Sequence, residues 1–173
     1  MKMITRFLSI LFIMAFIFTA GCVEGDSRRT EAAPPRELDV TQMFVLKNLS
    51  DELVRLEDLL KQNKAVLINF WATWCPPCRE EIPDLIELQE KYKDSSFTVL
   101  GIDVGESKTK VSGFVEKMEI NYPVVLDEDM SVTESYKVVG IPTTYLVNSE
   151  GKILGTYHAV TQELLDDVAA ALQ

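Results

Sequence analysis

Nearly continuous apolar runs alternate along the chain with segments whose apolar residues recur at helical spacing. Residues 65–71 (AVLINFW) and 97–104 (FTVLGIDV) are apolar at almost every position, which is typical of central strands buried on both faces. Residues 78–92 and 108–118 carry apolar side chains every three or four positions, which predicts helices. Pro83 lies inside the first of these helices and is expected to kink it.

Shorter segments complete the pattern at both ends of the domain. Turn-forming residues at 48–51 separate two apolar runs and favour an opening hairpin, and residues 148–151 (NSEG) join two further runs in the same way. The other elements expected are strands at 43–46, 53–56, 123–126, 143–147 and 152–157 and helices at 130–136 and 162–172. Strands that alternate with helices favour parallel pairing. We therefore expect a single α/β domain with a central mixed sheet, helices on both faces and an N-terminal β-hairpin.

The N-terminal segment has the pattern of a targeting sequence. Lys2 and Arg6 precede the apolar run 7–20, which is shorter than the roughly 20 residues of a membrane-spanning helix and suits a signal peptide. The run ends in residues 19–22 (TAGC), which resemble a bacterial lipobox and imply cleavage before Cys22 and attachment of lipid to its sulfur. An uncleaved membrane anchor and a soluble secreted form are the alternatives.

The chain is therefore expected to have three parts. Residues 1–22 form the signal peptide or anchor, residues 23–36 (VEGDSRRTEAAPPR) form a polar linker, and residues 37–173 form the folded domain. All three interpretations of the first part put the domain outside the cytoplasm. We expect a domain tethered by lipid or anchor to a membrane of the bacterial cell envelope, facing the periplasm or its equivalent.

Charge limits the classes of partner. The chain has 17 Lys and Arg against 27 Asp and Glu, a formal net charge of −10. An acidic surface argues against nucleic acid and against electrostatic binding to anionic lipid, and it favours basic partners. Solubility alone is the simpler explanation of the same excess.

The cysteines point to chemistry. If Cys22 carries lipid, only Cys75 and Cys78 remain in the domain, and a pair so close in sequence closes too small a loop to stabilise the fold much. Cys75 falls at the start of a helix, where free N–H groups and the helix dipole stabilise the attacking thiolate. Pro76 and Pro77 are tolerated in a first turn, but each removes an N–H group. We therefore expect modest thiolate stabilisation and a reducing pair.

A metal knuckle is the structural alternative for the cysteine pair. Zinc sites usually need four ligands, often from two such pairs. The sequence offers one pair in the domain and one histidine, His158, which we expect to be an ordinary surface residue. We therefore expect no metal and no cofactor.

Residues 69–83 (NFWATWCPPCREEIP) resemble the active-site segment of thioredoxin-like proteins, and they are most similar to the ResA/TlpA branch of exported, membrane-tethered thiol reductases. Residues 103–107 (DVGES), 122–127 (YPVVLD) and 140–144 (GIPTT) resemble the same branch, so the similarity covers about residues 38–172. It implies a thioredoxin-like fold and a thiol–disulfide oxidoreductase that reduces protein disulfides. It also implies a membrane electron donor of thiol-reducing type, with apocytochrome c as a candidate substrate during cytochrome c maturation.

The resemblance also implies roles for residues outside the cysteine pair. Pro142 matches a cis proline that faces the pair, and the backbone of Ile141 beside it would bind an extended substrate strand. Trp74, together with Pro76 and Pro77, would shape the substrate surface around the sulfurs. Trp71 is expected to pack in the core instead.

Glu81 is the candidate proton carrier. Thioredoxin has a buried aspartate where this chain has Asn69, and the ResA/TlpA branch shares the asparagine and carries a glutamate that matches Glu81. Glu81 lies one helical turn after Cys78, so a partly buried carboxylate there would have a raised pKa and could transfer a proton. A solvated helix residue is the alternative.

Other functions share parts of this pattern. A disulfide-introducing oxidase or isomerase would differ only in redox potential, and a copper or zinc chaperone would use the cysteine pair as ligands. A related peroxidase family has a threonine three residues before its cysteine, where this chain has Ala72. A lipoprotein that merely retains the fold is the last alternative.

Overall fold

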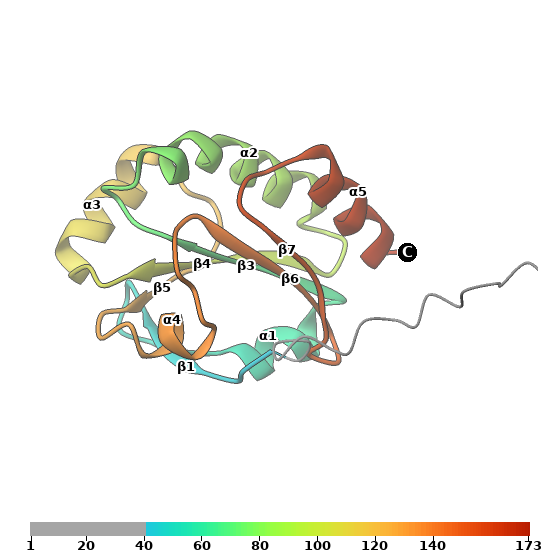
Figure 1. Ribbon diagram of the computed structural model, residues 1–173, viewed down its shortest axis with the longest axis horizontal. Helices are drawn as coiled ribbons and strands as arrows, with labels where there is room; N and C mark the ends of the chain where they lie inside the picture. Colours follow the sequence, from blue (N-terminus) through green and yellow to red (C-terminus); the bar gives the residue numbers. More distant parts are fainter. Residues whose placement is uncertain (1–40) are drawn as a thin grey trace, which may run out of the picture. The chain divides into compact units, whose positions relative to one another are not determined.

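A seven-stranded mixed sheet lies at the centre of residues 41–173, the part of the chain that the computed structural model describes (Figure 1). Its strand order is β2-β1-β5-β4-β3-β6-β7. The strands are β1 (Val45–Asn48), β2 (Leu53–Arg55), β3 (Ala65–Trp71), β4 (Phe97–Val104), β5 (Val124–Asp127), β6 (Thr143–Asn148) and β7 (Ile153–Tyr157). The helices are α1 (Leu56–Gln62), α2 (Pro76–Tyr92), α3 (Lys108–Met118), α4 (Ser131–Ser135) and α5 (Gln162–Ala171).

Parallel pairing is confined to the middle of the sheet. Strand β3 pairs in parallel with β4, and β4 with β5, as the intervening helices α2 and α3 require. The outer strands are antiparallel, β6 against β3 and β7 on one side, and β1 against β5 and β2 on the other. The predicted mixed sheet and N-terminal hairpin are confirmed.

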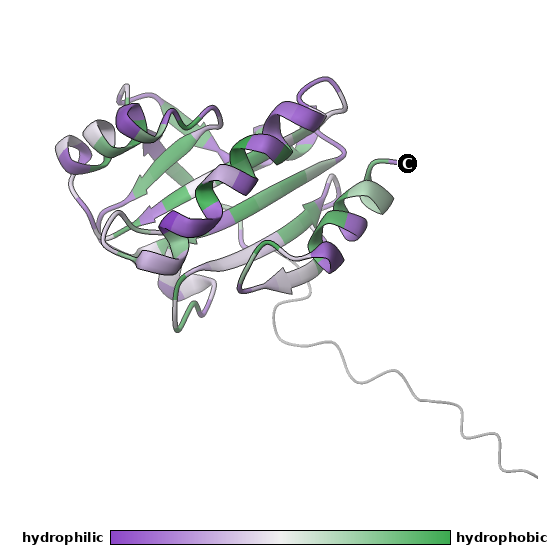
Figure 2. Ribbon diagram, turned by 90° about the horizontal axis from the view of Figure 1, so that it is seen from above, coloured by the Kyte–Doolittle hydropathy of each residue, from purple (hydrophilic) through white to green (hydrophobic). Residues whose placement is uncertain are grey.

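Two layers of helices bury the two faces of the sheet. Figure 1 shows α2, α3 and α5 on one face and α1 and α4 on the other. The first face packs Leu67, Leu85 and Leu164 into one core, and the second packs Phe70 and Tyr136 into another. Every residue of β3 is buried, which explains its continuous apolar run. In Figure 2 the strands are mainly hydrophobic, whereas the helices mix hydrophobic and hydrophilic stretches.

Some boundaries differ from the sequence prediction. The segment 53–56 was expected to be a strand throughout, but Leu56 begins α1, a helix that the sequence did not predict. Leu56 and Leu60 lie four positions apart and are both buried, a spacing too short to signal a helix by itself. Helix α2 begins at Pro76 instead of residue 78, and it continues through Pro83 to Tyr92.

The predicted signal peptide, the lipid site at Cys22 and the linker 23–36 lie outside the described residues. Between residues 41 and 173, no helix has the length and hydropathy needed to cross a membrane.

Candidate active site

Strand β3 delivers the cysteine pair to the start of a helix. The strand ends at Trp71, and after a short loop Cys75 caps the N-terminus of α2 with an extended backbone. Cys75 and Cys78 form a disulfide with their Cα atoms 5.3 Å apart. Both side chains are almost fully buried, with 2% of Cys75 and none of Cys78 exposed. Substrate access to Cys75 is therefore confined to a narrow opening.

Few backbone donors face the Cys75 sulfur. The N–H of Cys78 lies 3.3 Å from the Cys75 Sγ. Pro76 and Pro77, in the first turn of α2, have no N–H to offer. This arrangement agrees with the expectation of modest thiolate stabilisation by the helix terminus.

A proline loop at the start of the neighbouring strand β6 faces the cysteine pair. The Ile141–Pro142 peptide bond is cis, as the family resemblance implies. The Cys75 Sγ lies 3.7 Å from the Ile141 carbonyl oxygen. Because β6 is hydrogen-bonded to β3, the start of β6 lies next to the end of β3 and holds this loop beside the active-site segment. Ile141 is half-buried and Pro142 is buried.

The surface around the disulfide is apolar and exposed. Trp74 is 60% exposed, and Pro76 and Pro77 are exposed beside it in the chain. Val139, two residues before Ile141, is fully exposed and was not predicted as a site residue. A valine next to a glycine and the Ile-Pro pair was its only sequence signal. The exposed apolar residues Trp74, Pro76 and Pro77 next to a reactive disulfide are typical of a binding surface.

Glu81 is buried beside the cysteines. It is 6% exposed, and the Asn69 Nδ2 donates hydrogen bonds to the Glu81 Oε1 at 2.8 Å and to the Thr144 Oγ1 at 2.9 Å. Burial raises the pKa of Glu81 to about 7, the Asn69 hydrogen bond lowers it in part, and the charge of Asp84 adds to the rise. The alternative of a solvated Glu81 is therefore wrong.

A second carboxyl site lies on the other side of the active-site loop, and sequence reasoning missed it. The Glu106 carboxylate accepts hydrogen bonds from the Thr73 N–H at 2.5 Å and the Thr73 Oγ1 at 2.9 Å, and it forms an ion pair with Lys110. Burial raises the pKa of Glu106, but the hydrogen bonds from Lys110 and Thr73 outweigh it and leave the pKa below its ordinary value.

Asp103 completes this second site. It is paired in register with Trp71 at the end of β4, and none of its side chain is exposed. Burial, and then the neighbouring Glu106, raise the pKa of Asp103 to about 8. Asp103 and Glu106 stand in a stretch that carries the family resemblance. Their sequence signal was one acid at the end of a buried strand, Asp103, and a second acid, Glu106, two residues after that strand ends.

Two aromatic predictions have clear outcomes. Trp71 is 1% exposed and packs against Phe114 with ring centroids 5.5 Å apart, which confirms it as a core residue. His158 is exposed as predicted, but it is not remote from the site. Its Nδ1 lies 3.3 Å from the Pro142 carbonyl oxygen and 3.3 Å from the Thr143 Oγ1. Within residues 41–173, no three His, Cys, Asp or Glu side chains are grouped so that they could hold a metal ion.

The sequence relationships agree with this geometry. A family model described as the AhpC/TSA family matches residues 38–155, a stretch that contains both cysteines, Glu81, Glu106 and the cis proline. The chain belongs to the AhpC/TSA family. This membership covers the whole central sheet except the end of β7, and it agrees with the predicted thioredoxin-like fold.

Curated relatives of this AhpC/TSA protein are named ResA. The thiol-disulfide oxidoreductase ResA of Bacillus subtilis (strain 168) is 40% identical over 111 residues, which are 64% of this chain and 61% of ResA. The ResA of Halalkalibacterium halodurans is 31% identical over 125 residues, 72% of this chain and 70% of that protein. The chain thus matches less than two thirds of the length of the Bacillus subtilis relative.

Solved structures of similar proteins match this chain over nearly their whole length. The thioredoxin domain of a thiol-disulfide oxidoreductase from Bacteroides vulgatus has a TM-score of 0.70 and 29% identity, covering 78% of this chain and 96% of that one. A thiol:disulfide interchange protein of the thioredoxin family from Chlorobium tepidum TLS has a TM-score of 0.68 and 28% identity, covering 81% of this chain and 100% of that one. The thioredoxin-like fold predicted for this AhpC/TSA protein is confirmed.

Proposed function

We propose that this AhpC/TSA-family protein is a thiol–disulfide oxidoreductase that reduces disulfide bonds of exported proteins. The observation that carries the proposal is the Cys75–Cys78 disulfide at the start of α2, with the Cys75 Sγ 3.7 Å from the Ile141 carbonyl oxygen. A substrate strand laid along this carbonyl would bring its own disulfide to Cys75. The names of the ResA relatives support the same activity.

The reaction is a thiol–disulfide exchange in two steps. The Cys75 thiolate attacks one sulfur of the substrate disulfide, the other substrate sulfur leaves as a thiolate, and a mixed disulfide forms. The Cys78 thiolate then attacks the Cys75 sulfur and releases the second substrate thiolate. Two electrons pass to the substrate, and the protein is left with the Cys75–Cys78 disulfide present in the structure.

Glu81 is proposed to move the proton. Its pKa of about 7 lets it hold either protonation state near neutral pH, and it lies one helical turn after Cys78 on the buried side of α2. Its carboxylate would accept the Cys78 thiol proton before the second attack. Pro142 would keep the Ile141 backbone open for the substrate, and Trp74, Pro76 and Pro77 would contact the substrate around the sulfurs.

The location and the remaining partners follow from the sequence. We infer an extracytoplasmic protein, held at the membrane by lipid on Cys22 or by an uncleaved anchor. In an oxidising compartment a membrane thiol donor must reduce the pair again after each cycle. Apocytochrome c is the substrate suggested by the resemblance, because its haem-binding cysteines must be reduced before haem attaches.

The experiment is a covalent trap in the native host. The Cys78→Ser variant cannot complete the second step, so the substrates should accumulate as mixed disulfides on Cys75 and can be identified by mass spectrometry after non-reducing purification. Adducts dominated by C-x-x-C-H polypeptides would establish apocytochrome c as the substrate, whereas a broad set of exported proteins would indicate a general reductase or isomerase.

The Cys75→Ser variant is the matched control. It keeps the Cys78 thiol and the same charge, but it lacks the attacking sulfur of Cys75, so it should form no adducts and should not reduce insulin. Insulin reduction by this variant would overturn the assignment of Cys75 as the nucleophile. Absence of adducts with Cys78→Ser would instead favour a metal chaperone or an inactive fold.

A further inference from the structure

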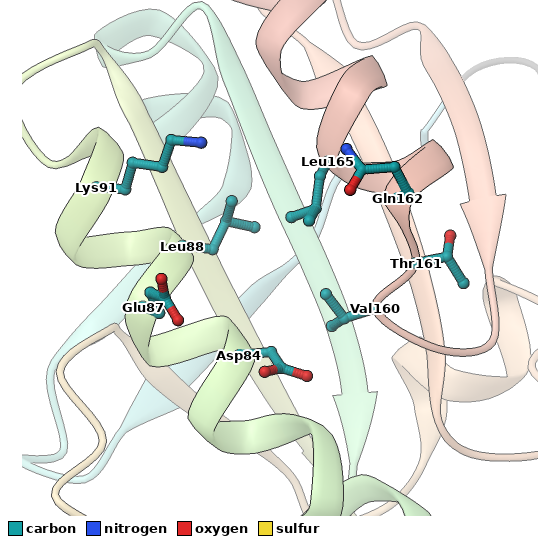
Figure 3. A pocket seen from close by; sticks show the side chains of 8 residues that line it. All are labelled: Asp84, Glu87, Leu88, Lys91, Val160, Thr161, Gln162 and Leu165. Carbon is teal, nitrogen blue, oxygen red and sulfur yellow. The ribbon is translucent and has the colours of Figure 1, made fainter.

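A groove with two carboxylates on one wall, those of Asp84 and Glu87, runs between α2 and the start of α5. Figure 3 shows Asp84, Glu87 and Leu88 on α2 facing Val160 and Leu165 across it. Lys91 closes its far end. The floor is thus aliphatic, and one wall carries carboxylates.

This groove continues to the redox site. A second hollow is lined by Glu81, Pro142 and His158, and it shares Asp84 and Val160 with the first. The two hollows therefore form one path that leads from the cis proline along α2. From Glu81 to Lys91 the helix rises roughly 15 Å, a length that about five residues of extended chain can follow.

The carboxylates along this path are available to a partner. Glu80, Asp84 and Glu87 recur at spacings of four and three, so they share one face of α2, and all three are exposed. Elsewhere in the described residues, four acidic side chains have lysine partners, but Asp84 and Glu87 are not among them. Lys91 lies over the ring of Tyr92, 4.9 Å from its centroid, instead of pairing with Glu87.

We propose that this groove binds a basic, extended flank of the substrate polypeptide, beyond the cysteine that reacts with Cys75. Lysine and arginine side chains would lay their aliphatic stems on Leu88, Val160 and Leu165 and bring their charged ends to Asp84 and Glu87. The acidic net charge of −10 would attract the same segment from a distance. The inference rests on the proposed function and names a class of substrate for it.

The test uses three disulfide peptides that differ only in their flanks. Each has the same central disulfide, with five lysines, five glutamines or five glutamates on both sides. The reduced full-length protein is mixed with each peptide, and the second-order rate constant is followed by tryptophan fluorescence. At low ionic strength the lysine peptide should react about tenfold faster than the glutamate peptide, and the ratio should fall to about twofold at roughly 0.5 M salt.

Charge-neutral variants locate the effect. Asp84→Asn/Glu87→Gln should reduce the lysine-to-glutamate ratio to about threefold, because only the long-range attraction remains. Glu116→Gln/Glu150→Gln removes the same charge from exposed positions outside the groove and should keep the ratio of the unmodified protein. The glutamine peptide gives the basal rate of each protein, because loss of the Asp84 charge also lowers the pKa of Glu81, and the lysine-to-glutamate ratio is compared within each protein.

Several outcomes would overturn the inference. Equal rates for all peptides would reject a basic flank while leaving the reductase function intact. Equal loss of preference in both double variants would place the attraction in the net charge and not in the groove. No reaction with any peptide would reject the proposed function itself, and the inference with it.

Discussion

Two buried carboxyl groups flank the active-site loop, and their neighbours differ in kind. Glu81, on α2, accepts a hydrogen bond from the neutral amide of Asn69. Asp103, at the end of β4, lies against the carboxylate of Glu106, which holds the Thr73 backbone and hydroxyl. Burial is the largest cause of a raised pKa at both, to about 7 for Glu81 and about 8 for Asp103.

The comparison teaches that a raised pKa does not by itself mark a catalytic group. A proton on Glu81 can leave without breaking a structural contact, because Asn69 donates to the carboxylate. Asp103 is buried next to the Glu106 carboxylate and is neutral while it is protonated. Deprotonation of Asp103 therefore places two negative charges side by side in a buried site. We expect Glu81 to act in the exchange reaction and Asp103 to act on the stability of the loop that carries Trp74 and Cys75.

The largest effect is expected from Glu81→Gln. The variant cannot accept the Cys78 proton, so disulfide exchange at pH 7 should slow by about 100-fold, within the usual range for loss of a general base. The rate of the unmodified protein should rise with pH through about 7, and the variant should lose this inflection. Stopped-flow rates with an uncharged disulfide peptide between pH 5 and 9 measure both effects.

Glu80→Gln is the control for this prediction. Glu80 is exposed next to Glu81 and carries the same charge, so its loss should leave the pH profile unchanged. An identical profile for the Glu81 variant and the unmodified protein would remove Glu81 from the mechanism. Asp103→Asn should keep the exchange rate within about threefold, and a larger loss would contradict the separation of the two sites.

The second largest effect is on the free energy of unfolding, and Glu81 and Asp103 are expected to change it over different pH ranges. Each group has a folded pKa above its unfolded value, about 7 against 4.5 for Glu81 and about 8 against 3.8 for Asp103. Between those values the unfolded chain releases a proton that the folded protein keeps, so the stability falls as pH rises and then levels off. The contribution of Glu81 to this fall in stability ends as the pH passes about 7, and the contribution of Asp103 continues until the pH passes about 8.

Asp103→Asn should therefore remove the loss of stability above neutral pH. The unmodified oxidised protein should lose on the order of 1 kcal/mol of unfolding free energy between pH 7 and 8.5, since one pKa unit corresponds to about 1.4 kcal/mol. The variant has a neutral side chain of the same shape that does not titrate, so its urea midpoint should stay level. A parallel fall in both proteins would assign the loss to other groups.

The sequence predicted the site on Glu81 and not the one on Asp103 for a physical reason. Glu81 shares a helix with Cys78, so spacing along the chain is enough to bring the two together. Asp103 meets the loop only through the parallel pairing of β4 with β3, and a pairing register is a tertiary feature. The same limit applies to His158, which lies after β7 and reaches the Pro142 carbonyl only through the folded chain.

The fold was more predictable than its short elements. Strands β3 and β4 and helix α3 have the predicted bounds. Burial on two faces leaves a continuous apolar run in each strand, and burial of one stripe leaves a helical period in α3. Helix α1 has seven residues and two buried leucines, too few to distinguish it from the end of a hairpin strand. Its conformation depends on the core that Phe70 and Tyr136 form beneath the sheet.

The smallest effect is expected from Lys110→Gln, which tests whether the site formed by Asp103 and Glu106 keeps its structure without its surface lysine. Lys110 is 55% exposed and forms its ion pair with Glu106 at the surface, so its removal should cost only about 0.5 kcal/mol of stability at pH 7. Its charge also lowers the pKa of Asp103, so the window in which stability falls should move to higher pH. Urea unfolding at several pH values measures both changes.

Lys117→Gln, on the same helix and exposed, removes the same charge away from Glu106 and should leave that window in place. A loss of more than about 2 kcal/mol for Lys110→Gln would mean that Glu106 cannot hold Thr73 without its lysine. The site would then be a three-membered buried network, and Asp103 would no longer be its main pH-sensitive member. A small loss of stability, with the fall in stability moved to higher pH, would instead mean that protonation of Asp103 controls how strongly Glu106 binds the loop at Thr73.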